Sequence, residues 1–200
     1  MQAEKEAVGD IDWLVSVDST VTLAHQHAAG ARKKGRGRGT KYVITRRTDH
    51  EDHLACDGRG RPLGFVLTGG NAADCASFED VMLSIKVRRT GPGWPRTRPD
   101  HVLGDKGYSS RKIRAYPRKR GIGHAIPARR DQQAHRLRRG RTGGRPPASD
   151  RQFYKRRNVV ERCFNRLKQY RAIATRYDKT RDSYHAAVTI ASLLLWIKPI

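Results

Sequence analysis

The apolar residues of this 200-residue chain come in short runs, separated by segments rich in glycine, arginine and proline. The run "DWLVSVDST" (12–20) predicts one buried strand that ends in Asp18. "HLACDGRGRPLGFVLTGG" (53–70) is typical of two strands around a glycine-rich turn. Helical periodicity follows in three segments, at about residues 74–85, 150–171 and 182–197. Strands mixed with helices, with helices closing the chain, predict an α/β fold with one mixed sheet flanked by helices.

The middle of the chain alternates between short apolar runs and basic connections. "HVLGDKGYSS" predicts a short strand ending at Asp105, and "GHAIP" predicts another. Between them, "RKIRAYPRKRG" predicts a helix that Pro117 interrupts. Residues 128–149 contain almost nothing to bury and are expected to form a mobile basic loop. We therefore expect a tail over residues 1–10 and a single domain over residues 11–197.

The formal net charge of +23 indicates the chemical class of the protein's partner. Self-repulsion of this size is tolerated mainly when the partner is a polyanion, so nucleic acid is the expected partner. Arginine outnumbers lysine 30 to 12, which favours forked contacts to phosphate. The glycine-rich segment after the first strand carries Arg32, Lys33 and Lys34 as candidate DNA-binding residues. A membrane-surface protein is disfavoured, because the basic residues do not lie along one amphipathic helix.

Three further features favour a cytoplasmic protein, associated with the nucleoid through its DNA partner. The start "MQAEKEAVGD" is acidic and polar, unlike a signal peptide. The longest apolar run, "AAVTIASLLLWI", is too short to span a bilayer. The three cysteines, Cys56, Cys75 and Cys163, are odd in number and widely spaced, as in a protein with reduced thiols.

A single acid, Glu161, stands among the basic residues of Tyr154–Tyr170, in the most basic of the predicted helices. Four polar residues of this helix fall within roughly 60° of one another at 100° per residue: Tyr154, Arg157, Glu161 and Lys168. They border the apolar stripe that faces the core, which is where a site can be both held by packing and reached by a ligand. The alternative is an ordinary pair between Arg157 and Glu161, worth about 0.3–0.5 kcal/mol.

Two aspartates favour the interpretation that Glu161 belongs to a ligand-binding site. Asp18 and Asp105 each close a predicted strand and precede a loop, and ligands gather at strand ends in open α/β sheets. Together with Glu161 they supply the carboxylate oxygens that Mg²⁺ prefers. Two such ions, about 3.5–4 Å apart, activate a water and stabilise the leaving oxygen in phosphoryl displacement. In a chain this basic, the substrate is expected to be a nucleic-acid backbone.

The pattern Tyr154-x2-Arg157-x3-Glu161-x6-Lys168 resembles the signature around the catalytic glutamate of DDE transposases from bacterial insertion sequences. The blocks "VDSTVTLAHQHAAGARKKG", "HLACDGRGRPLGFVLTGGNAADCASFEDV" and "DKGYSS" are similar to those of the insertion-sequence-five family. The resemblance covers about residues 11–197 and implies a ribonuclease-H-like fold. It places Asp18 on the first strand, Asp105 on a later one and Glu161 on a following helix.

The resemblance also implies a reaction and its participants. Water activated by Mg²⁺, or by Mn²⁺ as a substitute, cuts a DNA strand at the element's end, and the freed 3′-hydroxyl then attacks target DNA. Asp18, Asp105 and Glu161 carry over as the catalytic ligands of two ions. Tyr154, Arg157 and Lys168 carry over as DNA-positioning residues, and His25 and His27 as residues of a matching block with a DNA-facing role. A homo-oligomer on the element ends and target is expected.

Some features depart from the family's pattern. Only 17 residues precede Asp18, where relatives carry a helical segment that binds the element's ends, so this N-terminal segment is expected either to be separately encoded or to be lost. The segment 40–57 is longer and more polar than the expected strand. The prediction is therefore a transposase truncated at its N-terminus, an enzyme if its site assembles. The alternatives are a non-catalytic, basic DNA-binding remnant and a nuclease without strand transfer.

Overall fold

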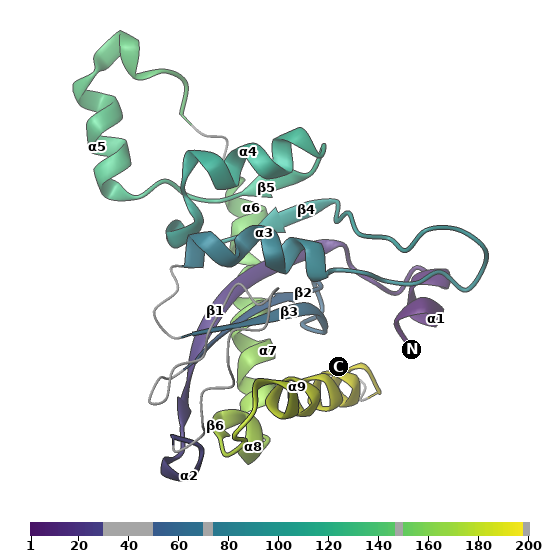
Figure 1. Ribbon diagram of the computed structural model, residues 1–200. Helices are drawn as coiled ribbons and strands as arrows, with labels where there is room; N and C mark the ends of the chain where they lie inside the picture. Colours follow the sequence, from purple (N-terminus) through teal and green to yellow (C-terminus); the bar gives the residue numbers. More distant parts are fainter. Residues whose placement is uncertain (30–49, 70–73, 147–149, 198–200) are drawn as a thin grey trace, which may run out of the picture.

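The computed structural model describes residues 1–29, 50–69, 74–146 and 150–197 (Figure 1). Its strands are β1 (Leu14–Ala24), β2 (His50–Cys56), β3 (Pro62–Gly69), β4 (His101–Leu103), β5 (Gly123–Ala125) and β6 (Thr175–Arg176). Its longer helices are α3 (Asp74–Ser84), α4 (Arg111–Lys119), α5 (Arg130–Arg138), α7 (Asn158–Lys168) and α9 (Arg181–Ile197). Its shorter helices are α1 (Gln2–Ala7), α2 (Gln26–Ala29), α6 (Arg151–Lys155) and α8 (Arg171–Ala174), with 3-10 turns η1 (Lys106–Tyr108) and η2 (Gly140–Gly143).

The strands form one mixed sheet in the order β3-β2-β1-β4-β5, with β6 paired to the far end of β1. The first three strands are antiparallel, whereas β4 and β5 run parallel to β1. The predicted hairpin is confirmed as β2 and β3, whose turn needs the positive φ of +79° at Gly60, a backbone conformation that glycine adopts without strain. The predicted α/β fold, with one mixed sheet flanked by helices, is confirmed.

Helices cover both faces of this sheet (Figure 1). Because side chains alternate along a strand, Val15 and Val17 of β1 point into a core shared with α3 and α4. Leu54 of β2 and Leu67 of β3 point to the opposite face, where α7, α8 and α9 pack. Leu14 lies on this second face beside Leu103 and Phe153 of α6. Asp18, an even-numbered residue of β1 like Leu14, therefore faces the side of the sheet that carries α7.

The prediction that the first strand ends at Asp18 is wrong. β1 continues to Ala24, because Ser19 to Thr22 pair with His53 to His50 of β2. The apolar run stops at Val17 because the strand leaves the core there: Asp18, Ser19 and Thr20 are half-buried, and Val21 is exposed. Asp18 therefore lies within a strand and is held by the sheet rather than by a loop.

Two predictions about helices need correction. The helix expected at about 150–171 is divided into α6 and α7, with Arg156 and Arg157 at the junction. The loop expected over 128–149 contains α5 and η2 in its described part, although its basic charge and exposure are as predicted. Pro117 does not interrupt its helix, since α4 runs from Arg111 to Lys119 with Pro117 buried inside it.

The tail over residues 1–10 folds onto the domain. It forms α1, whose Glu6 accepts a hydrogen bond from the Trp13 indole nitrogen at 2.8 Å. Asp10 lies 2.9 Å from the buried Arg61 guanidinium, which lowers the pKa of Asp10 to about 2. Of the unusual segment 40–57, residues 40–49 lie outside the described residues, and from His50 onward it is regular strand or its turn. No helix in the described ranges is both long and apolar enough to cross a membrane.

Candidate active site

Asp18 occupies the centre of the sheet. Its strand pairs with β2 on one side, where Asp18 lies opposite Leu54, and with β4 on the other. The side chain is only 20% exposed, and its Oδ1 accepts a hydrogen bond from the Ser19 amide at 3.0 Å. The carboxylate is thus fixed by a central strand and points toward α7.

Asp105 follows the neighbouring parallel strand. Leu103, the last residue of β4, pairs with Ser16 of β1, so Asp105 and Asp18 each lie two residues beyond this pair. Asp105 caps η1, and its Oδ1 accepts from the Gly107 amide at 2.7 Å. A Cβ at residue 107 would lie 2.9 Å from that oxygen, so glycine permits this close approach.

Glu161 comes from α7, which packs on the same face of the sheet. The helix is anchored by a buried stripe, consisting of Val159, Val160, Cys163, Phe164 and Leu167. Glu161 borders this stripe with its side chain 52% exposed, as the helical periodicity predicted. Three elements that are distant in sequence therefore bring Asp18, Asp105 and Glu161 to one region.

Arg157 bridges two of these carboxylates. Its Nη1 donates to Asp18 Oδ2 at 3.2 Å, and its Nη2 donates to Glu161 Oε1 at 2.8 Å. The i,i+4 pair with Glu161, considered from the sequence as the ordinary alternative, is therefore present. However, the same guanidinium also reaches across to the sheet, which an isolated helical pair would not do.

The charges in this region influence one another. Burial raises the pKa of the Asp18 carboxyl above its usual value, while the Arg157 guanidinium acts in the opposite direction. The negative charges of Asp105 and Glu161 raise the pKa of Asp18 further. Asp18 therefore lies close enough to both other carboxylates for their charges to matter, and adding a cation here would relieve unfavourable charge.

The predicted metal ligation remains a prediction. Carboxylate oxygens are suitable donors for Mg²⁺. In the described part of the chain, however, no three histidine, cysteine, aspartate or glutamate side chains converge closely enough to hold an ion in this arrangement. The Arg157 guanidinium, bonded to both Asp18 and Glu161, supplies the positive charge between them here.

The other motif residues of this helix region lie on either side of Glu161. Tyr154 is half-buried on α6, and its carbonyl accepts from the Arg157 amide at 3.0 Å. Lys168, at the end of α7, donates from Nζ to Thr20 Oγ1 at 2.6 Å. Lys168 therefore ties α7 to the strand that carries Asp18.

The two histidines lie apart from the carboxylates. His25 follows the end of β1, seven residues beyond Asp18, which corresponds to about 23 Å along an extended strand. Its ring centroid lies 4.8 Å from that of His27 and 4.6 Å from that of Tyr177. Their predicted DNA-facing role stays a prediction, and Arg32, Lys33 and Lys34 lie outside the described residues.

One interaction near the site could not be anticipated from sequence. Arg156, at the junction of α6 and α7, pairs with Asp12 just before β1. Asp12 also accepts from the Leu14 amide at 3.1 Å, so it joins the start of the central strand to the start of α7. These residues are 144 positions apart and belong to no shared motif, so nothing in the sequence indicated the pair.

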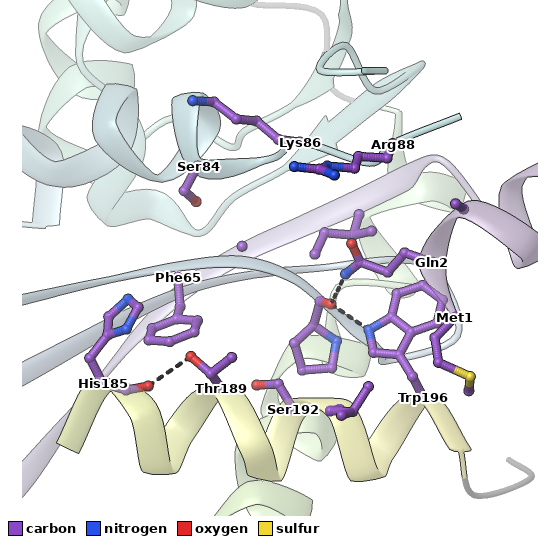
Figure 2. Close-up of a pocket in the computed structure, with 15 residues that line it drawn as sticks. Met1, Gln2, Phe65, Ser84, Lys86, Arg88, His185, Thr189, Ser192 and Trp196 are labelled. Carbon is purple, nitrogen blue, oxygen red and sulfur yellow. Dashed lines mark hydrogen bonds between the residues drawn. The ribbon is translucent and has the colours of Figure 1, made fainter. Parts of the chain in front are cut away.

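A large cavity lies elsewhere. It has a volume of about 620 Å³ and lies between β3, α9 and the segment after α3 (Figure 2). Trp196 and Gln2 both donate to the Pro62 carbonyl at its wall, at 2.7 and 3.3 Å. None of the three carboxylates lines this cavity, so the candidate site beside α7 is separate from this hollow.

Comparisons with known proteins show the family of this chain. Residues 10–196 match the family described as the transposase DDE domain. The chain is 27% identical over 179 residues to a putative transposase for insertion sequence element IS402 of Burkholderia cepacia, covering 89% of this chain and 77% of that protein. It is 28% identical over 146 residues to a putative transposase for insertion sequence element IS6501 of Brucella ovis, covering 73% of this chain and 96% of that protein.

Among solved structures, the chain is similar to a piggyBac transposase in a synaptic complex with hairpin DNA, with a TM-score of 0.46 and 11% identity. That match covers 92% of this chain and 46% of the other. The family match spans nearly the whole chain and includes all three carboxylates. The chain therefore belongs to the transposases with a DDE domain.

Proposed function

We propose that this domain cuts DNA at the ends of an insertion sequence and joins the freed end to target DNA. The observation that carries the proposal is the placement of Asp18, Asp105 and Glu161 in one region, on β1, just after β4 and on α7, in a chain of net charge +23. The charges of Asp105 and Glu161 both act on the pKa of Asp18. A carboxylate group on a rigid sheet and helix, in a strongly basic protein, suits phosphoryl transfer on a nucleic-acid backbone.

Asp18, Asp105 and Glu161 would hold the divalent ions, Mg²⁺ or Mn²⁺. Their oxygens are the donors that such ions prefer. When bound, a pair of ions lowers the pKa of a water and stabilises the departing 3′ oxygen. For both Asp18 and Glu161 to serve as ligands, Arg157 must release at least one of them, because its guanidinium now lies between the two.

The protein's own groups position the reaction. The Ser19 amide holds one oxygen of Asp18, and the Gly107 amide holds one oxygen of Asp105. Each carboxylate is therefore already fixed in orientation, and its second oxygen can bind an ion without further ordering of the side chain. Once released, the Arg157 guanidinium is placed to bind a backbone phosphate with its fork of donors. Lys168 keeps α7, and with it Glu161, fixed against β1.

The reaction then has two balanced steps. The oxygen of water bonds to phosphorus at the element's end, and the bond from phosphorus to the 3′ oxygen breaks, leaving a 3′-hydroxyl and a 5′-phosphate. That 3′ oxygen next attacks a phosphorus of target DNA and displaces the target's own 3′ oxygen. Because two ends must be joined to one target, we propose that the domain acts as a homo-oligomer on DNA, in the manner of the insertion-sequence-five family.

The test is DNA cleavage and joining by purified protein. Wild type is incubated with labelled duplex carrying an element end, supercoiled target and Mn²⁺, beside Glu161→Gln and Asp18→Asn. The matched control is Glu79→Gln, a half-buried glutamate of α3 on the other side of the sheet. We expect wild type and the control to cut and join, and the two site variants to do neither while still binding DNA. Metal-dependent cutting by Glu161→Gln would refute the assignment.

A second candidate function is DNA binding without catalysis. It is favoured by one observation, namely that Arg157 already neutralises Asp18 and Glu161, and so can keep the carboxylates together without any ion. The two candidates give different results in the same assay. A wild-type protein that binds DNA but yields no cut or joined product with either Mg²⁺ or Mn²⁺ is a binding protein, and cut products without joined ones indicate a nuclease.

A further inference from the structure

Residues 129–146 form a projecting segment, called here the basic arm. It comprises α5, η2 and the residues that follow, and Figure 1 shows α5 standing away from the layers of the domain. The arm contains seven arginines and one acid, Asp131. Six of these arginines are exposed and Arg136 is half-buried. The arm therefore places a high density of positive charge outside the core.

The arm has no role in the hydrophobic core. α5 has no buried residue, and its largest apolar side chain, Leu137, is 71% exposed. Within the described chain, the guanidinium groups of Arg138, Arg139 and Arg141 make no hydrogen bond or ion pair. Their charges are therefore not used to stabilise the fold, and they remain available to a partner.

The arm nevertheless has a defined shape. Gly143 lies so close to α5 that a Cβ at this position would come within 2.2 Å of the Arg136 carbonyl oxygen, so η2 folds back tightly on the helix. At the base, Gln132 accepts from the Arg129 amide and donates to the Ser109 carbonyl, both at 3.3 Å. The arm is therefore a folded projection attached to a particular point of the domain.

That point adjoins the carboxylate region. Ser109 directly follows η1, the turn that Asp105 caps. In chain order the arm follows β5 and precedes α6 and α7, so it lies between β5 and the helix that bears Glu161. α5 extends about 13 Å, the length of roughly four base pairs, so an arm attached at Ser109 can follow the backbone of a duplex that continues past the carboxylates.

We propose that the basic arm is a second DNA-binding surface, which binds backbone phosphates of duplex DNA beside the carboxylate site. The inference rests on the proposed function, since it takes the substrate to be DNA. Arginine forks match phosphate oxygens, and each phosphate neutralised releases counterions. The arm reads no base sequence. It sets affinity and holds the duplex, whereas the carboxylates perform the chemistry.

The test is the salt dependence of DNA binding without metal, measured by fluorescence anisotropy on a labelled duplex. The arm variant is Arg138→Gln, Arg139→Gln, Arg141→Gln. The matched control is Lys86→Gln, Arg88→Gln, Arg89→Gln, which removes the same charge from three exposed residues beyond the end of α3. We expect the arm variant to reduce the slope of log affinity against log salt by about 0.9 for each phosphate that the arm no longer neutralises. The control should change the slope by less than the equivalent of one phosphate.

A second variant moves the affinity in the opposite direction. Asp131→Asn removes the arm's acid, which pairs weakly with Arg129 at 3.8 Å with both side chains largely exposed. It should tighten DNA binding without changing the thermal unfolding temperature. Equal decreases of affinity in the arm variant and its control would show diffuse attraction and overturn the proposal. A preference of the arm for duplex RNA of the same length over DNA would overturn it too.

Failure of this inference differs from failure of the proposed function. Binding is measured without metal, so an arm variant that weakens binding in a protein that never cuts DNA supports the arm and refutes catalysis. Conversely, metal-dependent cutting by wild type, together with an unchanged salt slope in the arm variant, supports catalysis and refutes the arm.

Discussion

At the scale of single residues, Arg157 has two incompatible tasks. Its guanidinium bonds Asp18 and Glu161, yet these are the carboxylates proposed to hold metal. The Arg157 guanidinium and a metal ion from solution therefore compete for the same carboxylate oxygens. The apparent affinity of the metal-free protein for an ion is therefore lowered by whatever free energy these pairs contribute.

This competition predicts that Arg157→Gln tightens Mn²⁺ binding in the absence of DNA. The gain should be about 1.4- to fivefold, because the pair with the exposed Glu161 is worth roughly 0.2–1 kcal/mol, and isothermal titration calorimetry would measure it. Arg162→Gln, at an exposed position of the same helix, is the control for the change in charge. Equal or weaker binding by Arg157→Gln would show that the guanidinium does not occupy the metal's place. DNA cleavage should be abolished in Arg157→Gln, because no guanidinium then binds the backbone phosphate.

Asp10 gives a prediction about pH. Hydrogen bonding to Arg61 lowers the pKa of Asp10 to about 2, below the value of 3.8 for an unperturbed aspartate. A folded-state pKa below the unfolded one stabilises the fold above the unfolded pKa, and this stabilisation is lost as pH falls toward the folded one. Asp10→Asn should therefore lower Tm slightly and constantly between about pH 5 and 8, with the difference shrinking below about pH 4. A difference that grew in acid would contradict this role.

At the scale of elements, the close approach of β3 to α3 depends on Gly64. A Cβ at this position would lie 2.3 Å from Ser84 Oγ and 3.0–3.1 Å from the backbone of Ser84 and Ile85. Gly64→Ala should therefore destabilise the fold by about 1–3 kcal/mol, as overpacking does in other cores, which urea denaturation would measure. Gly143→Ala is the informative comparison, since its clash lies in the basic arm and should leave global stability unchanged. Equal stability of Gly64→Ala and wild type would show that the edge strand can shift.

Much of the element pattern was predictable, and the failures have physical causes. The hairpin, α3 and α9 follow from periodicity and glycine placement, and Glu161 was placed correctly beside the buried stripe. The strand past Asp18 could not be predicted from apolar content, which falls after Val17, although the β-branched Thr20, Val21 and Thr22 favour strand. α5 was not predicted because it buries nothing, yet its arginine, glutamine, alanine and leucine residues are good helix formers.

The site was predictable only in part. Spacing along one helix placed Arg157 near Glu161, and this pair is present at 2.8 Å. The hydrogen bond from Arg157 to Asp18 depends on how α7 lies across the sheet, and that is fixed by long-range packing and by the Arg156–Asp12 pair. Sequence periodicity carries no information about such a crossing. His25 lies seven residues beyond Asp18 because the strand is longer than its apolar run, and its DNA-facing role stays a prediction.

At the scale of the whole molecule, charge opposes folding and favours binding. A net charge of +23 repels itself in the compact state, and this repulsion is screened by salt over a Debye length of about 10 Å at 0.1 M. Raising sodium chloride from about 50 to 500 mM should therefore increase Tm while weakening DNA binding. The triple arm variant, which carries less charge, should gain less Tm from salt. A Tm that fell with added salt would show that ion pairs, rather than repulsion, dominate the electrostatics of the fold.

The central claim is that three carboxylates form one metal site in the folded domain. Its most direct test is thermal unfolding of wild type, Glu161→Gln and the control Glu79→Gln, each with and without Mn²⁺. At ten times the dissociation constant, an ion that binds only the native state adds roughly 1.4 kcal/mol, or about 3–6 °C in a chain of this size. We predict this shift for wild type and the control, and its absence in Glu161→Gln. A wild-type transition that Mn²⁺ does not move, or an equal shift in all three proteins, would contradict the account.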